Sequence, residues 1–266
     1  MTSISRNYSI IARSRDSPNQ SLFSFDWTMD PEFPSLGRED PDSKLIVCEV
    51  ALSAGYIKNY IINIGRRLGN NKVTLNVDNQ EYILELPDGM YNIEQFYSAL
   101  YLFMDNEGLI EPPGEDNGYK ESRPIDIVKI SGTSSIQITT RDDTSVTLNP
   151  PLAEMLGSAE VIPSSSRIIT ECDMKTGRVI HIKFNNATSS IINGNRSNII
   201  ASYLPSRYYG EYQNISPLTL TYLPLNGNAI KTIDIGLYFE DNSIVVFQEG
   251  KEDLVHLTFH VKQRSI

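Results

Sequence analysis

The chain has only two cysteines among its 266 residues. Cys48 and Cys172 each lie within or beside an apolar run typical of a strand, which favours buried free thiols over a disulfide and assembly in a reducing compartment. A catalytic role for either thiol is not expected, because apolar surroundings disfavour the reactive thiolate.

Histidine is equally scarce, with three residues in the whole chain. His256 and His260 are four positions apart in a segment that alternates like a strand, which places them on one face but about 13 Å apart. Two ligands of one metal ion lie much closer than that. His181 stands alone in a Val/Ile strand. We therefore expect no metal site and no cofactor.

Catalytic signatures are missing as well. The chain has no GxSxG elbow, P-loop, dinucleotide-binding fingerprint or HExxH motif. Its paired carboxylates, such as Asp142-Asp143 and Glu252-Asp253, fall in predicted turns, where Asp is favoured for backbone reasons alone. The sequence therefore does not predict an enzyme.

Basic charge and long apolar runs are also scarce. The net charge of −10 argues against a chain that binds nucleic acid over its whole surface. No apolar run approaches the ~20 residues of a membrane span. A small basic region remains near the start, where Arg6, Arg13 and Arg15 stand against Asp16 alone. An acidic stretch at 105–122 is interpreted as a solvated loop rather than a cation site.

Residues 1–44 lack any sustained hydrophobic period and are rich in Ser, Asp and Pro. Such a composition disfavours regular structure. Phe23, Phe25 and Trp27 are nevertheless unusual in a purely solvated tail. We predict an extended N-terminal arm that docks these rings on another surface, which can belong to a neighbouring subunit.

The segment 72–104 changes its hydrophobic period once. Apolar residues alternate over 73–77 and again over 82–86, with Asp78 and Asn79 between them, which predicts a hairpin. From 93 to 104 the period becomes that of a helix, with Asn92 as its N-cap.

Three short strands are predicted next, at 125–130, 135–140 and 145–148. A short helix follows at 150–156, with Gly157 as the residue that ends it. Together with the hairpin and its helix, these elements form a small α+β subdomain.

From residue 168 onward the pattern is strand after strand, about 10–16 residues apart, which indicates an antiparallel sandwich or barrel. This region offers about six strands, and 45–53 and 60–64 supply the two that complete an eight-stranded jelly roll. The predicted fold is mainly β: a single antiparallel jelly-roll sandwich with an inserted small α+β subdomain. Its predicted parts are the arm 1–44, the jelly roll 45–65 with 166–266, and the insertion 66–165.

The connection after residue 203 is rich in tyrosine and arginine, the residue types enriched at protein interfaces. Arg207, Tyr208, Tyr209 and Tyr212 are therefore candidate interface residues. The alternative is a loop that packs its own rings on the sandwich, and the sequence favours neither.

Four segments, taken in order, resemble a known family. They are LIVCEVALSAGYIKNYIIN, VTLNVDNQEYILELPDGMYNIEQFYSALYLFM with its P-x-G-x-Y turn before the helix, NPPLAEMLG, and SIINGNRSNIIASYLPSRYYGEYQNISPLTLTYLPLNGNAIKTIDIGLYFEDN. In order and pattern, over about residues 45–262, they resemble the penton-type minor capsid proteins of virophages and Polinton-like viruses.

The resemblance implies a virion protein without catalytic activity, assembled inside the host cell. Such proteins are single jelly rolls that form pentamers at the icosahedral vertices and contact the major capsid protein. An insertion between jelly-roll strands projects outward in some members and can carry a receptor-binding site. Arg6, Arg13 and Arg15 would then face inward, toward nucleic acid or an acidic partner. Two alternatives stay open: a β-sandwich module that binds a glycan or receptor, and an enzyme on a jelly-roll scaffold.

Overall fold

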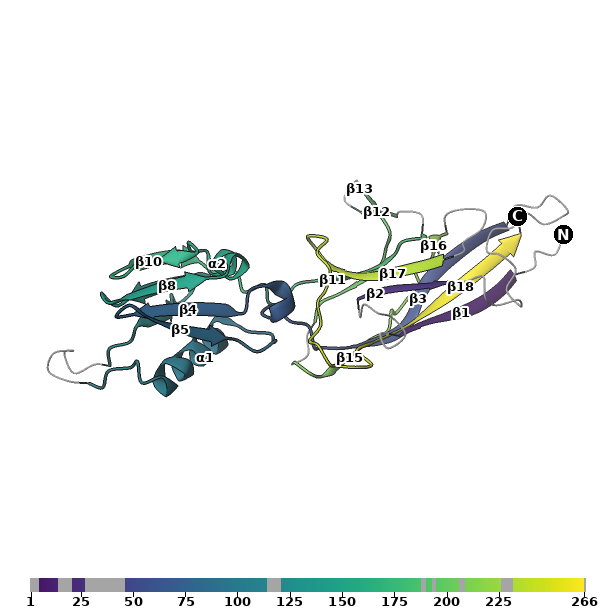
Figure 1. Ribbon diagram of the computed structural model, residues 1–266. Coiled ribbons are helices and arrows are strands. Elements are labelled where there is room, and N and C mark those ends of the chain that lie inside the picture. Colours follow the sequence, from purple (N-terminus) through teal and green to yellow (C-terminus); the bar gives the residue numbers. More distant parts are fainter. Residues whose placement is uncertain are drawn as a thin grey trace. The chain divides into compact units, whose positions relative to one another are not determined.

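The computed structural model describes residues 5–13, 21–26, 46–113, 121–187, 190–192, 195–205, 209–225 and 232–265. The chain forms two compact units, which are labelled by their elements in Figure 1. The sandwich unit comprises Met1–Ile61 and Gly177–Ile266, and the inserted unit comprises Ile62–Thr176.

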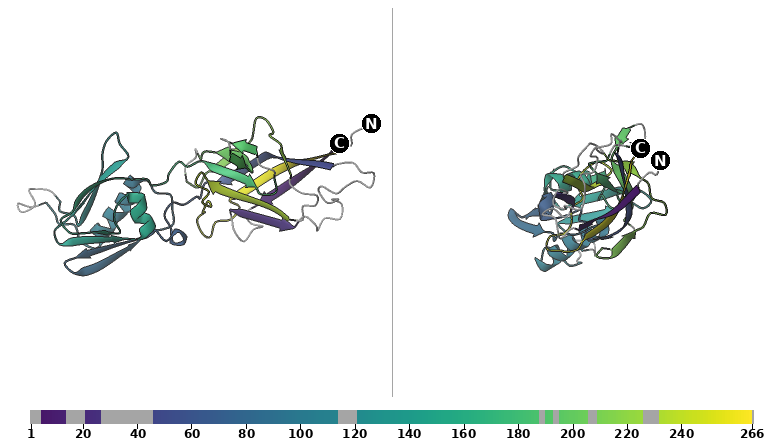
Figure 2. Two further views of the ribbon diagram at one scale, coloured as in Figure 1. Left: turned by 90° about the horizontal axis from the view of Figure 1, so that it is seen from above. Right: turned by 90° about the vertical axis from the view of Figure 1, so that its right-hand side faces the viewer.

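The sandwich unit contains two antiparallel sheets (Figures 1 and 2). The first has the order β1 (Ser5–Arg13), β18 (Val255–Ser265), β3 (Ile46–Lys58), β15 (Tyr212–Ile215), and β16 (Leu223–Pro224) also pairs with β3. The second has the order β14 (Ile199–Tyr203), β11 (Ile180–Phe184), β17 (Thr232–Phe239), β2 (Leu22–Asp26). A short hairpin of β12 (Ser190–Ile192) and β13 (Asn195–Ser197) lies outside both sheets.

The connectivity is that of a jelly roll. When β15 and β16 count as one strand and the eight strands are numbered along the chain, the sheets run 1-8-3-6 and 2-7-4-5. This is the double Greek key of an eight-stranded sandwich. The inserted unit interrupts the chain between the third and fourth strands. The predicted fold class is confirmed.

The core of the sandwich is made by alternate residues of both sheets. In β18, Val255, Leu257, Phe259 and Val261 are buried, as the alternation of the sequence predicts, and the intervening histidines lie on the other face. Phe259 meets Phe184 of β11 edge to face, with ring centroids 5.4 Å apart. This contact joins the two sheets.

The prediction of an N-terminal arm over 1–44 is wrong for residues 5–13 and 22–26, which are strands of the sandwich. The prediction of a strand at 60–64 is also wrong, because the structure has only isolated bridges there, such as Ile61 with Phe247. Within the described ranges, both β1 and β2 are edge strands with one neighbour each. Edge strands often carry polar residues, as β1 does at Ser5, Arg6 and Asn7, which makes their period hard to recognise in a sequence.

The described residues of the inserted unit form two sheets and two helices. Its four-stranded sheet has the order β5 (Gln80–Glu85), β4 (Lys72–Val77), β8 (Thr144–Leu148), β9 (Val161–Ile162). Its three-stranded sheet has the order β10 (Arg167–Glu171), β7 (Ser135–Thr140), β6 (Ile125–Lys129). The helices are α1 (Ile93–Asn106) and α2 (Pro150–Leu156), and a 3-10 turn spans Arg66–Leu68.

The boundaries of this unit differ from the predicted insertion 66–165. The unit runs from Ile62 to Thr176, because β10 pairs with β7 and therefore belongs to it. Cys172 lies here as a free thiol, whereas the side chain of Cys48 is outside the described residues. No helix in the described ranges is long and apolar enough to cross a membrane.

The predicted hairpin and helix are confirmed. Asp78 and Asn79 both adopt positive φ, 50° and 63°, which is the backbone of a tight two-residue hairpin turn. Asn92 caps α1 in a reciprocal capping box with Gln95, and the helix buries its apolar stripe of Phe96, Leu100 and Met104.

Replacement of Asn92 by alanine is expected to destabilise the inserted unit by about 1 kcal/mol, because the backbone N–H of Gln95 loses its acceptor. Urea denaturation measures the change. Ser98→Ala is the matched control, since that hydroxyl donates to the Glu94 carbonyl of its own helix and alanine favours helix. Equal losses in the two variants would contradict the capping role.

Candidate interaction surface

The outer face of the β1-β18-β3-β15 sheet carries a group of aromatic and basic side chains. Lys58 of β3 lies opposite Tyr212 of β15, and Tyr56 of β3 lies opposite His256 of β18. Side chains directly opposite on one face of a sheet contact each other. The pairing register therefore brings together residues that are about 200 positions apart in the chain.

The rings pack on one another. Tyr56 stacks on His256 with centroids 5.2 Å apart and meets Tyr212 edge to face at 5.4 Å. The Nζ atom of Lys58 lies 5.0 Å from the centroid of Tyr212 and 4.9 Å from that of Tyr60. Both distances are within the range of a cation–π interaction.

The group continues over the end of the tyrosine- and arginine-rich connection that follows residue 203. Tyr209 meets Tyr60 edge to face at 5.3 Å, and its hydroxyl donates to Oε1 of Gln248 at 2.8 Å. The next residue, Gly210, donates its N–H to the carbonyl of Asn59 at 2.6 Å. Gly210 has φ 86°, a left-handed conformation that glycine adopts without strain. We call Tyr56, Tyr60, Tyr209 and Tyr212 the tyrosine cluster.

A second aromatic contact lies on the same sheet. Tyr222, just before β16, has its hydroxyl 2.6 Å from Nδ1 of His260. The Nζ atom of Lys262 lies 3.7 Å from the centroid of the Tyr222 ring. Each of the two histidines of β18 thus has a tyrosine partner. Within the described part of the chain, no group of three or more His, Cys, Asp or Glu could hold a metal ion.

This surface has the composition of a protein interface rather than of a catalytic centre. Tyr212 is 54% exposed and Tyr209 is 39% exposed, so both rings are partly open to solvent although they also pack on the sandwich. Tyrosine offers a large rigid contact area together with a hydrogen-bonding hydroxyl. Three lysines, Lys58, Lys251 and Lys262, lie over the rings. The arrangement suits a partner with acidic and apolar groups.

The structure describes only some of the predicted site residues. Tyr209 and Tyr212 are in the tyrosine cluster. Arg13 ends β1 and lies opposite His256, on the same sheet. Phe23 is a correction, because the alternation of β2 places it in the core, 2% exposed and opposite Ile235 of β17. The remaining predicted residues lie outside the described residues or have side chains that are not described: Arg6, Arg15, Phe25, Trp27, Arg207 and Tyr208.

The sequence interpretation missed Tyr56, Lys58 and Tyr60. These residues alternate at the end of β3, and an alternating Tyr-x-Lys-x-Tyr pattern next to a buried strand is a signal for one aromatic face. The contribution of His256 depends on strand register, which the sequence does not contain.

No family model matches the chain, and no curated protein matches its sequence. A crystal structure of the mavirus penton protein is similar over 100% of both chains, with 14% identity and a TM-score of 0.39. A structure of the Sputnik virophage is similar over 97% of both chains, with 10% identity and a TM-score of 0.41.

Proposed function

We propose that this chain is a structural virion protein, a penton-type minor capsid subunit without catalytic activity. The observation that carries the proposal is the jelly roll with a complete domain inserted between its third and fourth strands. This architecture agrees with the order of the four sequence segments that resemble the penton-type family.

Side chains suited to catalysis are engaged in packing. His256 stacks on Tyr56, and His260 bonds to Tyr222. Burial raises the pKa of the Cys172 thiol to about 11, so the thiol is protonated and unreactive at neutral pH. These contacts support a structural role.

In the proposed assembly, five copies form a ring at each vertex and contact the major capsid protein. The two edges of the sandwich consist of different strands, and this difference allows copies to contact one another head to tail in a ring. One side ends in β1 and β2, and the other ends in β14 and β15. Contact between unlike sides of successive copies is head-to-tail, and such contacts close into rings when the rotation allows it.

The two units differ in net charge, and each net charge suits a different environment. The inserted unit, 62–176, has 18 acidic and 9 basic residues, whereas the rest of the chain has 15 acidic and 14 basic residues. A net charge of −9 on one domain keeps it solvated and repels like domains. We propose that the inserted unit projects from the shell and that the nearly neutral sandwich makes the contacts within it.

The test is to express the chain with a major capsid protein and to image the shells. Density for five copies at the fivefold vertices is the expected result. A soluble protein that stays outside the shells, or one spread evenly over the facets, would refute the proposal.

Attachment to a host receptor or glycan is the second candidate, favoured by the exposed rings of Tyr209 and Tyr212. Tyrosine rings stack on apolar faces of ligands, including sugars. A glycan array with the wild type and with Tyr212→Ala tests it. Binding that the substitution abolishes would favour attachment, and an empty array would remove this candidate.

A further inference from the structure

Strand β5 ends the four-stranded sheet of the inserted unit, so one of its edges faces away from β4 (Figure 1). The N–H of Leu86 donates to the carbonyl of Asn71 at 2.7 Å, just beyond the last residues that pair in the two strands. In an antiparallel pair, hydrogen-bonded residues alternate with residues whose backbone groups point the other way. The backbone groups of Leu84 and Tyr82 therefore bond to β4, and those of the residues between and beside them point outward.

Three residues of β5 thus offer their N–H and C=O groups at the outer edge: Glu81, Ile83 and Glu85. The six pairs between β5 and β4 follow one another without a register shift, so the edge is regular. The side chains of these three residues share the solvent face of the sheet, where Ile83 is 49% exposed. No other strand in the described ranges pairs with this edge. It can therefore accept an added strand.

Natural edge strands are protected by proline, a bulge, a short length, a covering segment or charged side chains. Strand β5 has no proline and no bulge. The opposite edge of the same sheet, β9, has only two residues. The edge of β10 is covered by the chain after α2, because a Cβ atom on Gly157 would clash with the carbonyl group of Glu171. The two glutamates of β5 are its remaining protection, and they restrict which strand can pair with it.

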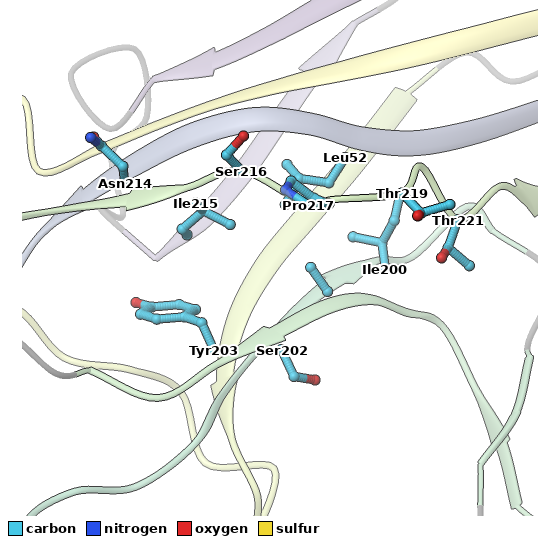
Figure 3. A pocket seen from close by; sticks show the side chains of 11 residues that line it. Leu52, Ile200, Ser202, Tyr203, Asn214, Ile215, Ser216, Pro217, Thr219 and Thr221 are labelled. Atoms are coloured by element: carbon cyan, nitrogen blue, oxygen red, sulfur yellow. The ribbon is translucent and has the colours of Figure 1, made fainter.

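The edges of the sandwich unit on the β14 and β15 side are irregular instead. Strand β14 pairs with β11 through a register shift between Ile182 and Lys183. Strand β15 has four residues, and the chain after it runs along a cavity of about 380 Å³ (Figure 3). The cavity is lined from both edges, by residues such as Ile200 and Pro217. The described strands of this side therefore offer an added strand no continuous ladder of backbone groups.

The charge of β5 differs between its two ends. The carboxylate of Glu85 is paired, because the Nζ atom of Lys72 lies 2.8 Å from its Oε1 and the guanidinium of Arg66 lies 3.9 Å from its Oε2. Glu81 lies opposite Asn76 and has no ion pair with a described residue. The inserted unit as a whole carries a net charge of −9. A cationic side chain beside Glu81 is therefore attracted both by this carboxylate and by the unit around it.

A second copy of this chain does not fit the edge. Antiparallel pairing of two β5 strands about Ile83 would set Glu81 of each copy opposite Glu85 of the other. Like charges directly opposite each other destabilise a strand pair. The inserted units, each with a net charge of −9, would also repel one another. The occupant is therefore a segment of a different protein, with basic rather than acidic side chains.

We propose that the edge of β5 binds an extended segment of another protein, in which an aliphatic residue faces Ile83 and a Lys or Arg faces Glu81. Antiparallel addition continues the pattern of the sheet and is the more stable pairing. In that direction the basic residue comes two positions after the aliphatic one. Backbone hydrogen bonds to the outward groups of β5 supply affinity, and the two side-chain pairs select the sequence. The inference goes beyond the capsid role and needs only the fold of the inserted unit.

The first test is hydrogen exchange of the full chain, read amide by amide by NMR. In the free chain, the outward amides of Glu81, Ile83 and Glu85 should exchange fast, and those of Tyr82 and Leu84 should exchange slowly. The probe is the synthetic peptide acetyl-Thr-Thr-Val-Thr-Lys-Thr-amide. Above its dissociation constant, the peptide should slow the exchange of the three outward amides about threefold or more and leave the other two unchanged.

Charge reversal tests the selection of sequence. Glu81→Lys should raise the dissociation constant of the peptide about three- to tenfold, because repulsion replaces attraction. A second peptide, with Glu in place of Lys, should bind the wild type more weakly by a similar factor and should bind Glu81→Lys as the first peptide binds the wild type. Glu160→Lys is the matched control, since this exposed residue lies just before β9 at the opposite edge and the substitution changes the net charge equally. It should leave the constant of the first peptide nearly unchanged.

Three outcomes would overturn the inference. Slow exchange of the outward amides in the free chain would show that the chain covers its own edge. A peptide that protects none of them at about 10 mM would show that the edge does not accept a strand. Equal weakening by Glu81→Lys and Glu160→Lys would show a general attraction of charge without strand pairing. If Glu81→Lys melts at a lower temperature than the wild type, the two peptides still test the charge pair on the wild type alone.

Discussion

Replacement of Phe259 by alanine is expected to destabilise the sandwich unit by about 3–5 kcal/mol. The side chain is fully buried in β18, and its ring packs edge to face on Phe184 of the opposite sheet. Removal of the ring leaves a cavity between two sheets whose pairing prevents them from closing over it. Urea denaturation, followed by tyrosine fluorescence and circular dichroism, measures the loss.

The matched control is Thr258→Ala, one residue earlier in the same strand and on the outer face. It should change the free energy of unfolding by less than about 1 kcal/mol. The transition of the inserted unit should not move in either variant, because its core comes from residues of 62–176 alone. Comparable losses at Thr258 and Phe259 would contradict the position of the core.

Strands with a buried face could be predicted from the sequence, whereas edge strands could not. The alternation at 254–261 predicted which residues of β18 face the core, and the change of period at 72–104 predicted a hairpin and a helix. Strand β1 has Ile10 and Ala12 inside but Ile11 outside, so its pattern resembles an irregular tail. Its partner β18 lies at the other end of the chain, and local sequence does not contain that pairing.

The tyrosine cluster, like the edge strands, could be predicted only in part, because its residues meet through strand pairing. Composition alone was sufficient to single out Tyr209 and Tyr212. Tyr56 and Tyr60 come from a different segment, and His256 comes from a third. They meet because the register sets Tyr56 opposite His256 and Lys58 opposite Tyr212. A surface built by register becomes visible only in the folded chain.

The two ends of the inserted unit, where the chain enters and leaves it, are joined by hydrogen bonds between the unit's own residues. We call this junction the stem. Asn63 lies at the start of the unit and is buried, and its Nδ2 donates to the carbonyl of Met174 near the end at 2.5 Å. The same side chain donates to the carbonyl of Tyr91 at 2.7 Å and accepts from the Tyr91 N–H at 2.8 Å. One amide therefore ties together the two ends of the unit and the segment before α1.

We therefore expect the fragment 62–176 to fold alone and to unfold in one cooperative transition. Its core of two sheets and two helices is made within the fragment, and Asn63 closes its ends. Asn63→Ala should lower its stability by about 2–4 kcal/mol, because the substitution leaves several buried backbone groups without partners. Thermal and urea denaturation of the purified fragment measure both quantities.

Asn76→Ala is the matched control, an exposed asparagine on the outer face of β4, and it should leave the stability of the fragment within about 0.5 kcal/mol of the wild type. A fragment that loses structure gradually, without a transition, would show that the inserted unit depends on the sandwich for its fold. An Asn63→Ala variant as stable as Asn76→Ala would instead show that the stem is held by its backbone pairing, such as that between Ile64 and Gly89.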